Sequence, residues 1–196
     1  MKKRFICVFL VFLSVQTFLV AAQANKRVQI KQIDTYCKSV DVYIKRNEKS
    51  AEIFADISST QKAEWQKFKN EAAREEADNG GNLNDNALVW RRSGKIIGAN
   101  FTFQSPSRDW AHFVMHYFRP DGSLAKIEAK LNSFYGNMTV ERTLYYDRNG
   151  SLLRRSVKFF DLTTQKAKEP EEIPVEKEFS IFKKVAKLPF ISLSRK

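Results

Sequence analysis

The sequence predicts an α+β fold in which N-terminal helices pack on one face of a six-stranded antiparallel β-meander. Three observations support this prediction. Apolar residues recur at helical spacing near the N-terminus, and three glycines lie 28 residues apart in the second half of the chain. Apolar and polar residues alternate in the segments between those glycines, as they do in half-buried strands.

Two helices are predicted before the sheet. The first covers about residues 28–45, where apolar residues three or four positions apart form one stripe: Ile30, Ile33, Cys37, Val40 and Ile44. The second covers about residues 61–77, where Trp65, Phe68 and Ala72 share helical spacing and helix-forming residues follow. Asn79-Gly80-Gly81 ends it.

The three glycines predict three β-hairpins in residues 87–162. Gly94, Gly122 and Gly150 each follow an aromatic residue by four positions and precede an aliphatic residue by two. Pro-Asp-Gly and Asn-Gly are turn sequences because Gly and Asn tolerate the positive φ of tight hairpins. The stretch from Tyr146 to Leu152 resembles one unit of the YD-type β-repeats of large secreted toxins and envelope proteins.

Alternation in the middle hairpin predicts its register. Folding at Pro120-Asp121-Gly122 places Tyr117 opposite Ala125, Met115 opposite Ile127 and Phe113 opposite Ala129. We therefore expect one buried face, formed by Phe113, Met115, Ile127 and Ala129. We expect the other face to expose His112, Lys126 and Lys130.

Residues 1–24 are predicted to be a cleavable signal peptide, which makes this an exported protein, periplasmic or secreted. A basic start at Lys2, Lys3 and Arg4 precedes a short apolar run, and Ala22-Gln23-Ala24 forms a small-x-small cleavage site. The alternative is an uncleaved anchor helix, but the apolar run is short for a bilayer. We expect no transmembrane span once the signal is removed.

The mature chain would have 31 basic and 22 acidic residues, an excess of nine positive charges. Such an excess favours anionic envelope components, and export makes nucleic acid an unsuitable partner. Cys37 would be its only cysteine, which excludes an internal disulfide. Its place on the helical stripe favours a buried hydrophobe over a reactive thiol.

Residues 25–162 are predicted to form one α+β domain. Residues 163–178, which are charged and contain Pro170 and Pro174, are predicted to be a linker. Residues 179–196 contain five basic residues, no acids and an apolar stripe, Phe179, Phe182, Val185 and Leu188. This amphipathic tail would either dock on its own domain, which we favour, or contact a membrane peripherally.

The sequence predicts a binding site in two loops that join the hairpins and emerge at the same edge. These loops contribute Arg108, Asp109, Trp110, Phe134 and Tyr135, a mixture that suits a sugar or a protein partner. The alternative is that these aromatic residues cap the end of the core.

Signals for catalysis and metal binding are weaker. His112 and His116 would chelate one metal on a helix, but on a strand they lie roughly 13 Å apart. We predict no metal site and no cofactor. The enzyme alternative is a small periplasmic hydrolase that uses His112, Glu128 and Thr102.

The sequence thus favours an exported, non-catalytic binding or scaffolding module of the bacterial cell envelope. Its partner would be an unknown protein, a glycan or an anionic envelope component. A third possibility, after the hydrolase, is a carrier that holds an apolar ligand between helix and sheet.

Overall fold

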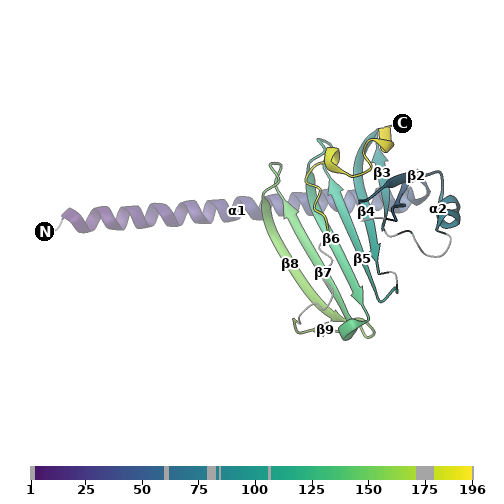
Figure 1. Cartoon of the computed structure of the whole chain (residues 1–196). Helices are drawn as coiled ribbons and strands as arrows, with labels where there is room; N and C mark the ends of the chain where they lie inside the picture. Colours follow the sequence, from purple (N-terminus) through teal and green to yellow (C-terminus); the bar gives the residue numbers. More distant parts are fainter. Residues whose placement is uncertain are drawn as a thin grey trace.

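A long helix and a nine-stranded antiparallel sheet form the fold (Figure 1). The computed structural model describes residues 3–59, 62–78, 83, 85–105, 107–170 and 179–195, without the side chains of residues 3–22 and 195. Helix α1 spans Lys3–Arg46 and α2 spans Glu71–Ala77. The strands are β1 (Glu52–Asp56), β2 (Trp65–Phe68), β3 (Asp85–Arg92), β4 (Lys95–Gln104), β5 (Trp110–Phe118), β6 (Leu124–Ser133), β7 (Met138–Tyr146), β8 (Leu152–Asp161) and β9 (Ala167–Lys168).

The strand order is β2-β1-β3-β4-β5-β6-β7-β8-β9, and every neighbouring pair is antiparallel. The predicted α+β class and antiparallel meander are confirmed, but the sheet has nine strands instead of six. The additional strands are β1, β2 and β9. Strand β9 lies within residues 163–178, which we predicted to be a linker. Residues 171–178 of that segment lie outside the described part of the chain.

The predicted second helix was wrong over its first half. Residues Trp65–Phe68 form β2, which pairs with β1, and only Glu71–Ala77 is helical. Asn70 caps this short helix by accepting a hydrogen bond from the backbone N–H of Ala73. Trp65 packs edge-on against Phe101 and Phe190, so tertiary contacts override the local helical pattern.

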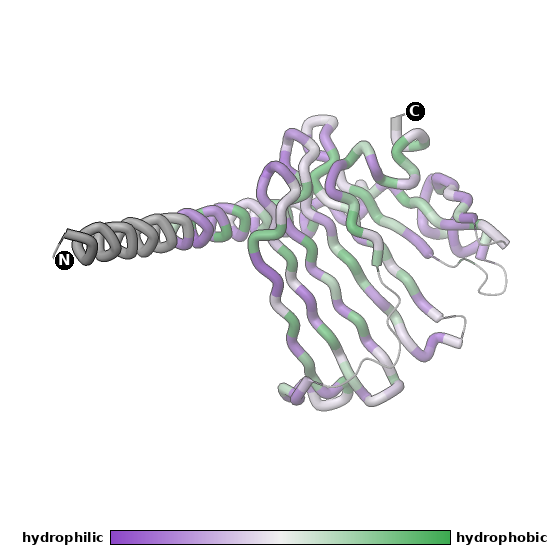
Figure 2. Tube along the Cα trace, turned by 60° about the vertical axis from the view of Figure 1, so that its left-hand side comes forward, coloured by the Kyte–Doolittle hydropathy of each residue, from purple (hydrophilic) through white to green (hydrophobic). Residues whose placement is uncertain are grey.

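Both faces of the sheet are covered. Helix α1 crosses one of them, which we call the helix face, and projects past β8 (Figure 1). Its buried side chains pack there against strand residues in one cluster: Ile30, Ile33, Cys37 and Val40 against Trp90, Ile97, Tyr117, Ala125 and Tyr145. The alternation of hydropathy along the strands is visible in Figure 2. Among the described residues, no helix is long and apolar enough to cross a membrane.

Residues 179–195 lie across the opposite face, which we call the tail face (Figure 1). They form no α-helix but include two 3-10 turns, Val185–Lys187 and Leu193–Arg195. Leu188 and Phe190 are fully buried there, and Phe190 stacks on Phe54 with 4.3 Å between ring centroids. The backbone N–H of Leu124 donates to the carbonyl of Lys183, which ties this segment to the start of β6.

A β-bulge follows each of the three hairpin turns. The unpaired residues are Ile97, Ala125 and Leu153, each three positions after the positive-φ glycine of its turn. All three pack in the helix-face cluster. A bulge adds one residue to one strand and so exchanges the faces of the residues beyond it.

The bulge at Ala125 overturns the predicted register of the middle hairpin. Met115 pairs with Glu128, and His116 pairs with Ile127. Ile127 and Ala129 are buried as predicted, but on the tail face, whereas Phe113 is 39% exposed and Met115 is half-buried. His112 and Lys126, predicted to be exposed, are 3% and 8% exposed, and Lys130 is half-buried.

Candidate functional site

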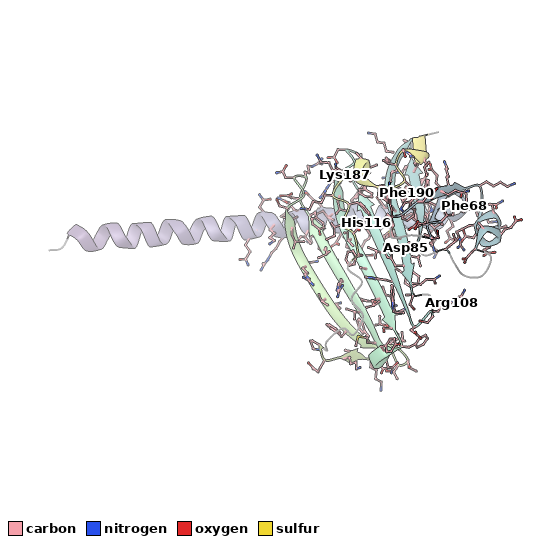
Figure 3. All side chains as sticks on the ribbon, viewed as in Figure 1. Phe68, Asp85, Arg108, His116, Lys187 and Phe190 are labelled. Carbon is pink, nitrogen blue, oxygen red and sulfur yellow. The ribbon has the colours of Figure 1, made fainter. Side chains whose placement is uncertain are left out.

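The two loops predicted to form a binding site do meet at one edge of the sheet. The backbone N–H of Phe134, at the end of β6, donates to the carbonyl of Asp109, just before β5, over 2.9 Å. Phe134 and Tyr135 are 72% and 54% exposed. Arg108 is also exposed and has a φ of 60° (Figure 3). Two aromatic rings and a guanidinium are thus accessible at this edge.

The other two predicted site residues have supporting positions. Asp109 is half-buried and accepts a short hydrogen bond from the hydroxyl of Ser107. Trp110 is half-buried and packs against a small cluster of Leu131, Met138 and Val140 at the end of the sheet. Trp110 therefore caps the core beneath the loops, as the alternative interpretation of the sequence had it.

A third segment, which contains Asp161, Thr163 and Lys168, also holds this edge in place through hydrogen bonds. The sequence did not predict its role. The side-chain amide of Asn137 donates to Asp161 over 2.8 Å, and the hydroxyl of Thr163 donates to the Asn137 amide oxygen over 3.0 Å. Lys168 in β9 donates to the carbonyl of Gly136 over 2.8 Å. The chain turns directly after Asp161. The charged and polar composition of the segment favoured a linker over this turn, although Asp161 and Thr163 are residue types that often form turns.

The two histidines lie on the tail face, beneath residues 179–195. The Nε2 of His116 is 3.2 Å from the carbonyl oxygen of Ser180, and the ring of His112 meets that of Phe179 edge-on at 5.1 Å. Burial lowers the pKa of His116 to about 4, so this imidazole is neutral at physiological pH. Figure 3 shows His116 in the middle of the sheet.

This placement removes the geometric basis of the hydrolase alternative. His112 pairs with Leu131 and lies on the tail face, whereas Glu128 pairs with Met115 and lies on the helix face. Thr102 pairs with Phe113, so it also lies on the helix face. His112 therefore cannot exchange a proton with Glu128 or Thr102, because the sheet separates them. Among the described residues, no three potential ligands are grouped so that they could hold a metal ion.

A polar network on the helix face was also missed by the sequence analysis. Lys126 forms ion pairs with Asp34 over 3.1 Å and with Glu128 over 2.7 Å, and the hydroxyl of Tyr145 donates to Asp34 over 2.8 Å. Burial alone would raise the pKa of Asp34, but its hydrogen bonds from Tyr145 and Lys126 outweigh burial and lower it. The network attaches α1 to the sheet.

Cys37 lies beside this network and is 2% exposed. Burial raises the pKa of its thiol to about 12. The thiolate is the reactive form of cysteine, so burial favours the less reactive thiol form of Cys37.

A cavity of about 530 Å³ lies between α1 and the turns that follow β5 and β7. Its lining combines polar and charged side chains, among them Gln29, Gln32, Arg119 and Arg148, with apolar surface from Ile33, Pro120 and Ala125.

No family model, no curated protein and no solved structure matches this chain.

Proposed function

We propose that this protein is an exported, non-catalytic binding or scaffolding module of the bacterial cell envelope. In this proposal, three equivalent hairpins with a 28-residue spacing provide a rigid frame, and one edge of that frame contacts the partner. The partner is an envelope protein, a glycan or an anionic envelope component, and not a nucleic acid.

The observation that carries the proposal is the exposure of Phe134 and Tyr135 on a braced edge. Large exposed aromatic side chains lose hydration at little cost in entropy when they meet a partner, because few bonds need to be immobilised. Hydrogen bonds from the neighbouring loop and from Lys168 hold the backbone of this edge in place. Such an edge is preorganised for binding.

Co-sedimentation with membrane and cell-wall fractions tests the proposal. We expect the mature chain to bind one of these fractions. The double substitution Phe134→Ser and Tyr135→Ser should weaken that binding about tenfold or more, as loss of a hot spot does. Val42→Ser is the matched control, because Val42 is 50% exposed on α1, away from this edge. Equal binding by all three proteins would contradict the proposal.

Export is tested separately, by the intact mass of the protein recovered from its native envelope. We expect a chain that begins at Asn25. A mass that retains residues 1–24 would contradict the proposed signal cleavage and support an anchor.

The second candidate partner is a membrane surface, contacted through residues 179–195. Lys183, Lys184 and Lys187 are exposed, while Leu188 and Phe190 pack inward. This arrangement supports a peripheral electrostatic contact with anionic lipid, which would weaken as salt is added.

A further inference from the structure

The outer edge of β8 is unpaired over most of its length. Beyond β8 the sheet has only the short β9, which pairs with β8 at Phe159 and Phe160 (Figure 1). No other described residue pairs with this edge, so the backbone from Arg154 to Lys158 is open on that side. An open strand edge is a template on which another extended chain can pair.

The backbone groups that point outwards from this edge belong to Arg155 and Val157. The backbone N–H of Asp161 donates to the carbonyl of Lys166, on the β9 side of β8. In an antiparallel ladder the N–H and C=O of one residue point to the same side, and the side alternates from residue to residue. The register with β7 is regular from Arg154 to Asp161, so Val157 and Arg155 direct two N–H and two C=O groups away from β7.

A proline prevents β9 from covering this edge. Lys168 pairs with Phe159, and the same register continued would place Pro170 opposite Val157. Proline has no N–H to donate to the outward carbonyl of Val157. Strand β9 ends at Lys168, and the outward groups of Arg155 and Val157 lie beyond its reach.

Three exposed cations flank the open edge on both faces of the sheet. Arg154 stacks on Tyr145 on the helix face, with 4.4 Å from its guanidinium carbon to the ring centroid. Side chains alternate along a strand, so Lys158 also lies on the helix face and Arg155 lies on the tail face. Of the three cations, only Lys158 has an acidic residue, Glu141, directly opposite it on β7.

Helix α1 adds two more cations beside this edge. Lys26 and Arg27 lie four and three residues before Ile30, so they continue the side of the helix that packs on the sheet. Both are exposed, and α1 projects past β8 in this region (Figures 1 and 2). A strand added beside β8 would therefore pass next to these two residues, which we call the basic end of α1.

The same charges make a second copy of this chain a poor partner. In antiparallel pairing centred on Ser156, Arg154 of each copy would lie opposite Lys158 of the other. Like charges directly opposite one another destabilise a pair of strands, whereas opposite charges stabilise it. The edge thus disfavours self-association and favours an acidic strand.

We propose that β8 accepts an extended acidic segment of another protein as an additional antiparallel strand. The backbone of this segment pairs with Arg155 and Val157. Its acidic side chains lie opposite Lys158, Arg155 and Arg154, and thus at the first, fourth and fifth positions of the segment. The basic end of α1 adds to the attraction. The strand is antiparallel, as is every other pair in this sheet.

Fluorescence anisotropy with a labelled peptide, acetyl-Glu-Val-Thr-Glu-Glu-Val-amide, tests this proposal. We expect saturable binding to the mature chain, which weakens as salt is added. A peptide with Gln in place of each Glu should bind at least about tenfold more weakly. No saturable binding of the acidic peptide would overturn the site, and equal affinities of the two peptides would overturn its selection by charge.

A pair of variants at one position tests pairing through the backbone. Val157→Pro removes an outward N–H without removing a hydrogen bond to β7, and it should weaken peptide binding about tenfold or more. Val157→Thr is the matched control, because it keeps the N–H and the β-branched shape, and it should bind as the unsubstituted chain does. Melting temperatures check that both variants fold. Equal binding by the two variants would contradict strand addition.

Amide hydrogen exchange of the unsubstituted chain gives an independent test. The amides of Arg155 and Val157 should exchange rapidly in the chain alone and slowly with the peptide bound, whereas the amide of Ser156, which points to β7, should be protected in both. Unchanged exchange at Arg155 and Val157 would overturn the proposal. Protection that instead rises with protein concentration alone would make a second copy the occupant.

Two pairs of charge substitutions locate the site. Arg155→Gln with Lys158→Gln should weaken binding of the acidic peptide about tenfold or more. Lys45→Gln with Lys49→Gln is the matched control, because these exposed lysines follow Tyr43, which donates a hydrogen bond to β3 on the far side of the sheet. Equal loss in the two double variants would mean that only overall charge matters and would overturn the site.

This proposal does not depend on the aromatic edge. The Phe134→Ser and Tyr135→Ser variant should bind the acidic peptide as the unsubstituted chain does. If that variant lost peptide binding, the peptide would lie at the aromatic edge and the assignment to β8 would be wrong.

Discussion

His116 is an uncharged histidine inside an aromatic cluster. It is 1% exposed, and its ring centroid lies 5.3 Å from that of Phe101 and 5.6 Å from that of Phe182. Its pKa of about 4 means that the folded state resists protonation, whereas an unfolded chain takes up the proton near pH 6.5. Stability from this residue is therefore complete above about pH 6.5 and is lost as the pH falls towards 4.

We predict that acidification from about pH 7.5 to about pH 5 lowers the free energy of unfolding by about 2 kcal/mol through His116. The variant His116→Gln keeps a side-chain N–H donor for the Ser180 carbonyl but does not titrate. Its denaturant unfolding curves should show a smaller loss over the same range. If the loss were the same in both proteins, His116 would not be the titrating group.

Lys126 is the residue for which the sequence and the structure disagree most clearly. The predicted register exposed it, so its replacement would have had little effect. In the structure it is 8% exposed and pairs with Asp34 and Glu128. Burial would lower its pKa, but these two carboxylates outweigh burial and raise it.

We predict that Lys126→Met lowers the free energy of unfolding by about 1–3 kcal/mol, because it removes the cation that donates a hydrogen bond to Asp34. The cost falls short of that of a fully buried pair, since the side chains of Asp34 and Glu128 are 35% and 46% exposed. Lys130→Met, four residues further along the strand, should change stability by less than about 0.5 kcal/mol. Equal effects in urea titration would disprove the structural role of Lys126.

At the scale of the elements, the C-terminal segment is part of the core. Phe190 is fully buried, and its ring stacks on that of Phe54. Its ring centroid lies 5.1 Å from that of Trp65 and 5.7 Å from that of Phe101. We predict that Phe190→Ala lowers the free energy of unfolding by about 3–5 kcal/mol, through lost burial and a residual cavity.

Lys187→Ala provides the comparison for Phe190→Ala, because Lys187 is exposed in the same segment (Figure 3). It should cost less than about 0.5 kcal/mol in denaturant unfolding. A stable Phe190→Ala protein that loses binding to anionic vesicles would instead mean that this segment serves as a membrane element.

At the scale of the whole molecule, we predict that the stability of the sheet domain depends on the second half of α1. Residues 23–28 are exposed, and among the side chains of α1 that the structure describes, the first that pack in the core are Ile30 and Ile33. We predict that mature chains beginning at Asn25 and at Gln29 melt at the same temperature. A chain that begins at Asp34 should melt lower, because it loses two isoleucines worth about 1.5–3 kcal/mol each. A loss already present in the chain from Gln29 would contradict this boundary.

Much of the candidate site followed from local patterns. The turn glycines have positive φ, as Gly94, Gly122 and Gly150 were expected to have, and the loops between hairpins had to emerge together once the meander was assumed. That reasoning placed Phe134 and Asp109 at one edge of the sheet, where a backbone hydrogen bond joins them. It missed the bracing segment near Asp161, because a charged segment before two prolines has no periodic pattern that indicates a strand.

By itself, the sequence determined the α+β class, the antiparallel pairing and the apolar stripe of α1, because periodicity and turn chemistry are local properties. Only the tertiary structure decided which side chains share a face. The bulged residues Ile97, Ala125 and Leu153 pack in one cluster with side chains of α1, and each bulge exchanges the faces of the residues beyond it. Because both faces of the sheet are buried, alternation of hydropathy could not show where that exchange occurs. For the same reason, the separation of His112 from Glu128 became evident only in three dimensions.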